Sequence, residues 1–93
     1  MIEAKLREIH IGDVVQHFKR EMCSENELKE NKYLYKVIAF ATHTETEEPL
    51  VIYQALYAPF ATYARPTLMF YSKVDKEKYP NVNQEYRLEV IRP

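Results

Sequence analysis

Two long apolar runs separated by a polar segment dominate the middle of the chain. The runs are residues 33–41 and 50–57, and residues 42–49 between them are mostly polar. Both runs are rich in β-branched and aromatic residues, so the pattern predicts two strands joined as an antiparallel hairpin. The first run is apolar at odd and even positions, which predicts a central strand buried on both sides over part of its length. The connecting loop lacks an Asn-Gly or Asp-Gly turn, and its length leaves side chains free to face a ligand.

The N-terminal part of the chain predicts one helical turn followed by a first strand. Apolar residues recur there at helical spacing: Ile2, Leu6 and Ile9. A turn at residues 12–13 leads into residues 14–19, whose β-branched and aromatic side chains predict a strand. Alternation along this strand places Phe18 in the core and points His17 and Lys19 the other way.

Residues 20–32 form the most polar segment, which we interpret as an excursion between two strands. Ser24 is followed three residues later by Glu27, and this spacing is typical of a capping box that opens a short helix. Charged segments are more often solvated faces than interaction elements. The pattern therefore favours a solvated loop with one helical turn, and a partner-docking element is the alternative.

The C-terminal third predicts shorter elements. Residues 62–65 suit a short strand, which Pro66 must end or hold at a sheet edge because proline cannot donate a ladder hydrogen bond. Residues 68–71 are apolar and predict further core, residues 75–84 are hydrophilic, and residues 86–91 alternate as expected for a closing strand. The whole chain then predicts a single mainly β domain, a small partly closed β-barrel with one or two short helical turns.

Composition narrows the classes of protein that the chain can represent. The 93 residues are 46% hydrophobic and 29% charged, as is ordinary for a soluble globular domain. A net charge of -1 disfavours nucleic acid as a partner, because no general basic field attracts it. There is no apolar run long enough for a membrane span or a signal core, so a cytoplasmic protein is expected. Cys23 is the single cysteine, cannot form an internal disulfide and has no cationic cluster beside it, which predicts an idle thiol.

A few polar residues stand inside otherwise apolar blocks, where they must find partners or face a cavity. They are His17, His43, Glu45, Tyr53 and Arg65. Glu45 follows His43 by two positions and could orient its imidazole, or both could bond the amides of their own loop. Arg65 offers a fork of donors that suits a carboxylate or phosphate, and an internal salt bridge to Glu45 is the alternative.

Other chemistry is weakly supported. His17 and His43 with one carboxylate could form a three-ligand metal set, but no local ligand pair is present. The serines lie in polar contexts without a nucleophile elbow, and one glycine, Gly12, cannot make a phosphate-cradling loop. No cofactor or metal is therefore expected. An aromatic group could stack bases or peptide prolines: Tyr53, Tyr57, Phe60 and Tyr63.

Four blocks of the sequence, in this order, resemble the bacterial family called domain of unknown function 1653. The blocks are His17-Phe18-Lys19, residues 41–46, residues 50–57, and Arg65-Pro66 with Met69-Phe70. The resemblance runs from about residue 12 to residue 87. It implies a small single-domain protein grouped with the SH3-like barrels, and it carries no established activity.

Three hypotheses of different classes follow. The favoured one is a binding module for an anionic small molecule or a peptide carboxylate, with six ligand-binding residues: His17, Lys19, His43, Glu45, Tyr53 and Arg65. The second is a small enzyme that uses His43, oriented by Glu45, as general acid or base. The third is a protein-protein interaction module in which these residues form a structural polar network. A monomer or a weak homodimer through the edge at residues 62–65 is expected.

Overall fold

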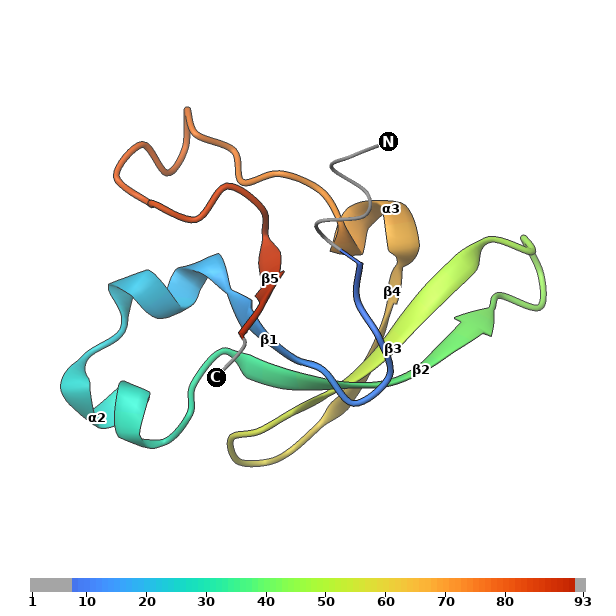
Figure 1. Cartoon of the computed structure of the whole chain (residues 1–93), viewed down its shortest axis with the longest axis horizontal. Helices are drawn as coiled ribbons and strands as arrows, with labels where there is room; N and C mark the ends of the chain where they lie inside the picture. Colours follow the sequence, from blue (N-terminus) through green and yellow to red (C-terminus); the bar gives the residue numbers. More distant parts are fainter. Residues whose placement is uncertain (1–7, 92–93) are drawn as a thin grey trace.

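One antiparallel sheet organises the computed structural model of the chain, which describes residues 8–91 (Figure 1). Five strands lie in the order β4-β3-β2-β1-β5. Their bounds are Val14–His17 (β1), Leu34–Thr42 (β2), Pro49–Ala55 (β3), Thr62–Pro66 (β4) and Leu88–Val90 (β5). The helical elements are the 3-10 helix η1 (Phe18–Met22) and the short α-helices α2 (Glu25–Lys29) and α3 (Thr67–Phe70). Within the described residues, no helix has the length and apolar character needed to cross a membrane.

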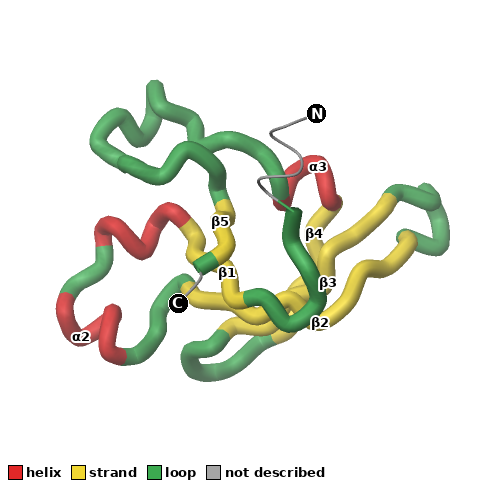
Figure 2. Tube along the Cα trace, viewed as in Figure 1, coloured by secondary structure: helices red, strands yellow, loops and turns green. Residues whose placement is uncertain are grey.

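The sheet stays open, which confirms the mainly β prediction and corrects the barrel. Closure would require the two edge strands to pair, but β4 pairs with β3 and β5 pairs with β1, at opposite ends of the strand order. The sheet is not closed or strongly curled, so neither the partly closed barrel predicted from strand count nor the SH3-like barrel implied by the family resemblance is observed. Most of residues 71–87 is loop (Figure 2), and this segment supplies no further long strand that could complete a barrel.

The predicted hairpin is present as β2 and β3, with Thr42 opposite Pro49 at its end. The pairing shifts between Val37 and Ala39, so that Ile38 forms a β-bulge with no partner on β3. The prediction that the first strand is buried on both sides is wrong, because Tyr35 and Val37 are buried whereas the intervening Lys36 and the bulged Ile38 are exposed. Side-chain alternation thus gives β2 one core face and one solvent face.

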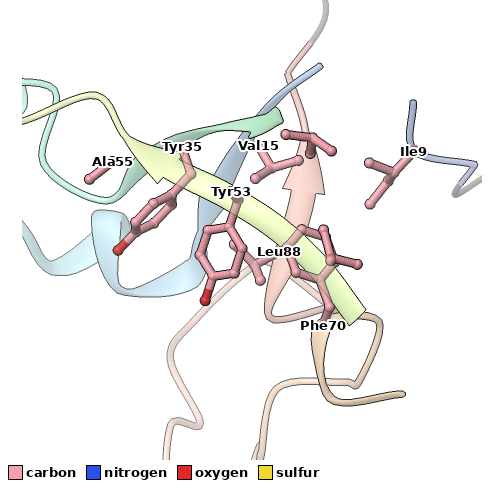
Figure 3. Close-up of a cluster of buried hydrophobic side chains, with 9 residues drawn as sticks. Ile9, Val15, Tyr35, Tyr53, Ala55, Phe70 and Leu88 are labelled. Atoms are coloured by element: carbon pink, nitrogen blue, oxygen red, sulfur yellow. The ribbon is translucent and has the colours of Figure 1, made fainter. Parts of the chain in front are cut away.

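The main core gathers on one face of the sheet (Figure 3). It consists of Ile9, Val15, Tyr35, Val37, Val51, Tyr53, Ala55, Phe70 and Leu88. Phe70 from α3 is fully buried, but Leu68 and Met69 are 88% and 49% exposed, which corrects their prediction as core. A helix of one turn can direct only part of its surface at the sheet. Ile9 belongs to the core, whereas Ile2 and Leu6 of the predicted helical turn lie outside the described residues.

The first strand is shorter than predicted because its last side chain caps a 3-10 helix. The Nδ1 atom of His17 accepts a hydrogen bond from the Lys19 amide at 3.1 Å, and the chain turns into η1. Strand alternation therefore ends at His17. The rings of His17 and Phe18 stack with centroids 4.5 Å apart, so the prediction that they point in opposite directions is wrong. Phe18 is buried with Val74 and Val82 in a second, smaller core cluster.

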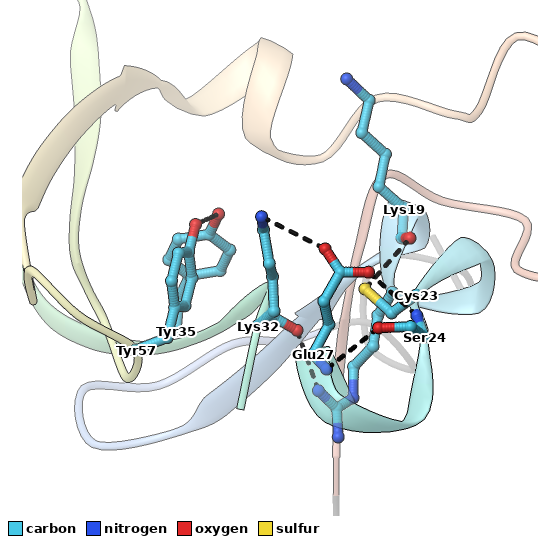
Figure 4. Close-up of polar contacts among 8 residues, drawn as sticks. Lys19, Cys23, Ser24, Glu27, Lys32, Tyr35 and Tyr57 are labelled. Carbon is cyan, nitrogen blue, oxygen red and sulfur yellow. Dashed lines mark hydrogen bonds and ion pairs between the residues drawn. The ribbon is translucent and has the colours of Figure 1, made fainter. Parts of the chain in front are cut away.

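The polar segment after η1 contains the predicted capping box (Figure 4). The Glu27 amide donates to Ser24 Oγ at 3.2 Å, and the Ser24 amide donates to Glu27 Oε1 at 2.9 Å. Lys32 pairs with Glu27 at 3.4 Å, and Arg20 donates to the Lys32 carbonyl at 2.8 Å. Burial and the nearby Glu27 raise the pKa of Cys23, which keeps the thiol protonated.

The C-terminal loop is fastened to β1 and η1 by Glu21 and Gln84. The Glu21 carboxylate accepts the amides of Asn83 and Gln84, each at 2.8 Å. Apart from the tyrosines, Gln84 is the only buried polar side chain within residues 8–91, and its Nε2 donates to the carbonyls of Gln16 at 2.8 Å and Tyr86 at 2.9 Å. Lys76 donates to the Gln84 carbonyl at 2.9 Å. These bonds hold residues 75–87 against the end of β1.

Candidate functional site

A half-open cleft of ≈ 290 Å³ lies where the C-terminal loop meets the end of β1. Its walls come from the last residue of β1, from η1, from β4, and from residues 75–79 and 87 of the C-terminal loop. The lining residues are His17, Phe18, Lys19, Arg65, Asp75, Lys78, Tyr79 and Arg87. Three of the residues predicted from the sequence, His17, Lys19 and Arg65, therefore meet in one place, although Arg65 lies far from the other two along the chain.

The cleft carries more positive than negative charge. Four of its lining side chains are cationic, namely Lys19, Arg65, Lys78 and Arg87, and Asp75 is its one carboxylate. The ion pairs found within residues 8–91 are made by His10, Lys32 and Lys73, and none involves a cation of the cleft. The predicted alternative of a salt bridge between Arg65 and Glu45 is thus wrong. Four cations and one carboxylate leave the cleft with a surplus of positive charge, which favours the binding of an anion.

His17 contributes a neutral donor to this basic site. Burial, then the charges of Arg65, Lys19 and Arg87, lower the pKa of His17 to about 4, so the ring is neutral near pH 7. Because Nδ1 accepts the Lys19 amide, the single ring proton resides on Nε2. Asp75, Lys78 and Tyr79 are the other ionisable side chains that line the cleft. His17 is therefore arranged as a hydrogen-bond donor through Nε2 and not as a general base.

Arg65 lies on β4 and interacts with Tyr53 of the neighbouring strand. The register of β3 and β4 places Arg65 opposite Val51, on the core face that also carries Tyr53 and Tyr63. Burial raises the pKa of Tyr53, whereas the charge of Arg65 and a hydrogen bond from its guanidinium lower that pKa. Tyr53 is only 5% exposed and does not line the cleft, so it supports Arg65 from the core and leaves contact with a ligand to other residues.

A continuous set of tyrosine contacts crosses the same face of the sheet. Tyr35 packs edge-to-face on Tyr53, Tyr57 and Tyr63 at centroid distances of 5.3, 5.7 and 6.3 Å. The hydroxyls of Tyr35 and Tyr57 lie 2.7 Å apart (Figure 4), and burial together with this bond raises the pKa of Tyr35. Three members of the predicted aromatic group are thus joined through Tyr35, whereas Phe60 is 55% exposed in the turn before β4.

His43 and Glu45 lie apart from the cleft. Both belong to the loop between β2 and β3, at the end of the hairpin that points away from η1 (Figure 1). His43 Nδ1 accepts the Glu45 amide at 3.0 Å and the Thr46 amide at 3.3 Å, as the alternative of bonding within the loop predicted. Glu45 meets His43 through its backbone. No group of three metal-binding side chains occurs within residues 8–91, so the set containing His17 and His43 is not assembled.

Sequence reasoning missed half of the cleft. Arg87 lies next to β5, and its carbonyl accepts the Phe18 amide at 3.0 Å, which brings its side chain to the end of β1. Only the long-range pairing of β1 with β5 reveals this neighbourhood. Asp75, Lys78 and Tyr79 belong to a segment whose composition is that of a solvated loop. Arg87 gave no local signal, because a single arginine is ordinary in an alternating strand pattern.

These features define a small single-sheet antiparallel β protein with a basic half-open cleft at one end of the sheet. The chain belongs to the family described as Protein of unknown function (DUF1653), whose model matches residues 13–89. This confirms the resemblance seen in the sequence, and the matched range includes every residue that lines the cleft. No curated protein and no solved structure matches the chain.

Proposed function

We propose that this protein is a binding module that holds an anionic small molecule or a peptide carboxylate in the cleft beside His17. The observation that carries the proposal is the group of cations, Lys19, Arg65 and Arg87, that surrounds a neutral imidazole without an ion-pair partner among the described residues. An arginine fork suits bidentate contact with a carboxylate or phosphate.

The size of the cleft supports a small ligand group. Its volume of ≈ 290 Å³ lies just below the range for small-molecule sites, which is about 300–1,000 Å³. The enzyme alternative has less support, because it relies on His43 and Glu45 and neither residue lines the cleft. His17 is also a poor base, since its free nitrogen carries the proton.

A thermal-shift screen with single anionic metabolites and short peptides tests the proposal. The screen compares the native protein with Arg65→Met and with the matched control Lys36→Met, which removes a cation from the exposed outer face of β2. Methionine keeps an unbranched stem and removes the charge. We expect at least one anion to raise the melting temperature of the native protein and of Lys36→Met, with a much smaller rise for Arg65→Met.

Two results would contradict binding in the cleft. One is an equal rise for all three proteins, which would locate the ligand elsewhere. The other is that no anion of a broad panel raises the melting temperature of the native protein, while circular dichroism shows that Arg65→Met is folded. Arg65 would then have neither a ligand role nor a structural one. Loss of a charged hydrogen bond predicts about 10- to 100-fold weaker binding for Arg65→Met.

A further inference from the structure

The charge surplus of the cleft distinguishes between two kinds of anion. A carboxylate carries one negative charge and two oxygens in a plane, and one arginine fork can satisfy both. A phosphomonoester carries about -1.5 to -2 charges near pH 7 and three acceptor oxygens. The lining cations outnumber the single carboxylate Asp75 by four to one. A doubly charged ligand therefore compensates this surplus better than a carboxylate does.

The cationic donors of the cleft come from three different parts of the chain, which suits a ligand that accepts hydrogen bonds from several directions. Arg65 reaches the cleft from β4, Lys19 from η1, and Arg87 from the residue before β5. One planar carboxylate would occupy a single guanidinium and leave the other cations uncompensated. A tetrahedral phosphoryl group offers an oxygen to each of several donors that arise on different elements.

His17 adds a donor without adding charge. Its Nε2–H is fixed by the bond that Nδ1 accepts from the Lys19 amide. The ring contacts Phe18 and Tyr33 at centroid distances of 4.5 Å and 5.6 Å, and these contacts limit its rotation. A fixed neutral donor discriminates between ligands by geometry, because it can serve only an acceptor placed in its direction.

The cleft suits a single anionic group better than a polynucleotide. A single-stranded nucleic acid site needs a basic groove that follows several phosphates. Here the four cations line one cleft of ≈ 290 Å³, in a chain of net charge -1. Tyr79, whose ring meets Phe18 edge-on at 4.8 Å, lines the same cleft and offers an apolar surface to the group that carries the anion.

Building on the proposed function, we infer that the anion is a phosphomonoester dianion, contacted by Arg65, Arg87 and Lys19 and accepting a hydrogen bond from His17 Nε2. The inference assigns a ligand class to the cleft. It also gives Arg87 a role equal to that of Arg65, which the sequence did not indicate.

Isothermal titration with matched probes tests this assignment. Phenyl phosphate, benzoate and inorganic phosphate are titrated into the native protein, Arg65→Met, Arg87→Met and the control Lys36→Met at pH 7.5 and fixed salt. Phenyl phosphate and benzoate share the ring and differ in the anion. We expect phenyl phosphate to bind at least about 10-fold more tightly than benzoate and inorganic phosphate, and about 10- to 100-fold more weakly to either arginine variant than to Lys36→Met.

The outcomes separate this inference from the proposed function. Benzoate binding as tightly as phenyl phosphate, with loss in both arginine variants, overturns the phosphate assignment and leaves the anion cleft in place. Inorganic phosphate binding as tightly as phenyl phosphate overturns the monoester. Equal binding of phenyl phosphate to all four proteins, or no binding of any probe to the native protein, overturns the phosphomonoester site. The anion cleft itself is overturned only by the two thermal-shift results described above.

Discussion

Replacing Gln84 with leucine should loosen the C-terminal loop and destabilise the whole domain. Gln84 is 8% exposed, and its Nε2 satisfies the carbonyls of Gln16 and Tyr86 at 2.8 and 2.9 Å. Leucine has nearly the same size but no donor, so both carbonyls would lose that partner. The variant would then place an apolar side chain against backbone carbonyls that have lost this hydrogen-bond donor.

The expected magnitude follows from the number of orphaned acceptors. An unsatisfied buried acceptor costs about 1–3 kcal/mol, and leucine regains part of this by burying apolar area, so Gln84→Leu should lower the free energy of unfolding by about 2–4 kcal/mol. For a domain of this size the melting temperature would fall by roughly 10–25 °C. Gln54→Leu is the matched control, because its Nε2 bond to the Phe60 carbonyl at 3.2 Å is exposed and should contribute less than about 1 kcal/mol.

Urea denaturation followed by circular dichroism measures both variants. The anion titration provides a second measurement, since Gln84 holds the loop that carries Lys78 and Arg87, and weaker binding is expected for Gln84→Leu and not for Gln54→Leu. A loss below about 1 kcal/mol for Gln84→Leu, or equal losses for the two variants, would refute the view that buried glutamine bonds hold the loop to β1.

Two further predictions concern pH and backbone strain. The folded pKa of His17, about 4, lies below its ordinary value of 6.5, so protons bind the unfolded chain more readily and the free energy of unfolding should fall as the pH drops from about 6.5 towards 4. Urea melts at pH 7 and pH 5 should show this fall for the native protein and for His43→Gln, but a smaller fall for His17→Gln. An unchanged fall in His17→Gln would contradict the lowered pKa of His17. Glu47 adopts φ 62 in an exposed loop, a left-handed conformation that glycine tolerates. Glu47→Gly should therefore raise the free energy of unfolding by about 0.5–1 kcal/mol in the same melts, and a decrease would show that the conformation is not strained.

The sequence predicted local elements better than it predicted how they meet. The hairpin, the capping box at Ser24 and the edge strand before Pro66 depend on neighbouring residues, and all three are present. The barrel depended on whether the edge strands β4 and β5 also pair with each other, which alternation alone does not determine. The predicted first strand, residues 14–19, was also too long. The composition of these residues favours a strand throughout, but the His17 side chain caps η1 and so ends the strand.

The candidate site was predicted in part, for a related reason. Arg65 and His17 stood out as polar residues in apolar blocks, and both line the cleft. His43 had the same local signature, but its partners are the amides of its own loop. Arg87 had no distinguishing signature, because its place in the cleft arises from the pairing of β5 with β1. Local patterns identify polar residues that need partners, and only tertiary structure shows which partners they have.

The bulge at Ile38 also bears on changes in the length of the chain. Val37 pairs with Tyr53 and Ala39 pairs with Ile52, so Ile38 stands between two consecutive positions of β3. Removing this one residue would leave every other pair of the hairpin in place and keep each side chain on its present face. Removing Lys36 instead would displace Tyr35 from its pair. Ile38 therefore marks a point where a one-residue deletion can be accommodated within a strand, a kind of change that sheets otherwise accept mainly in their loops.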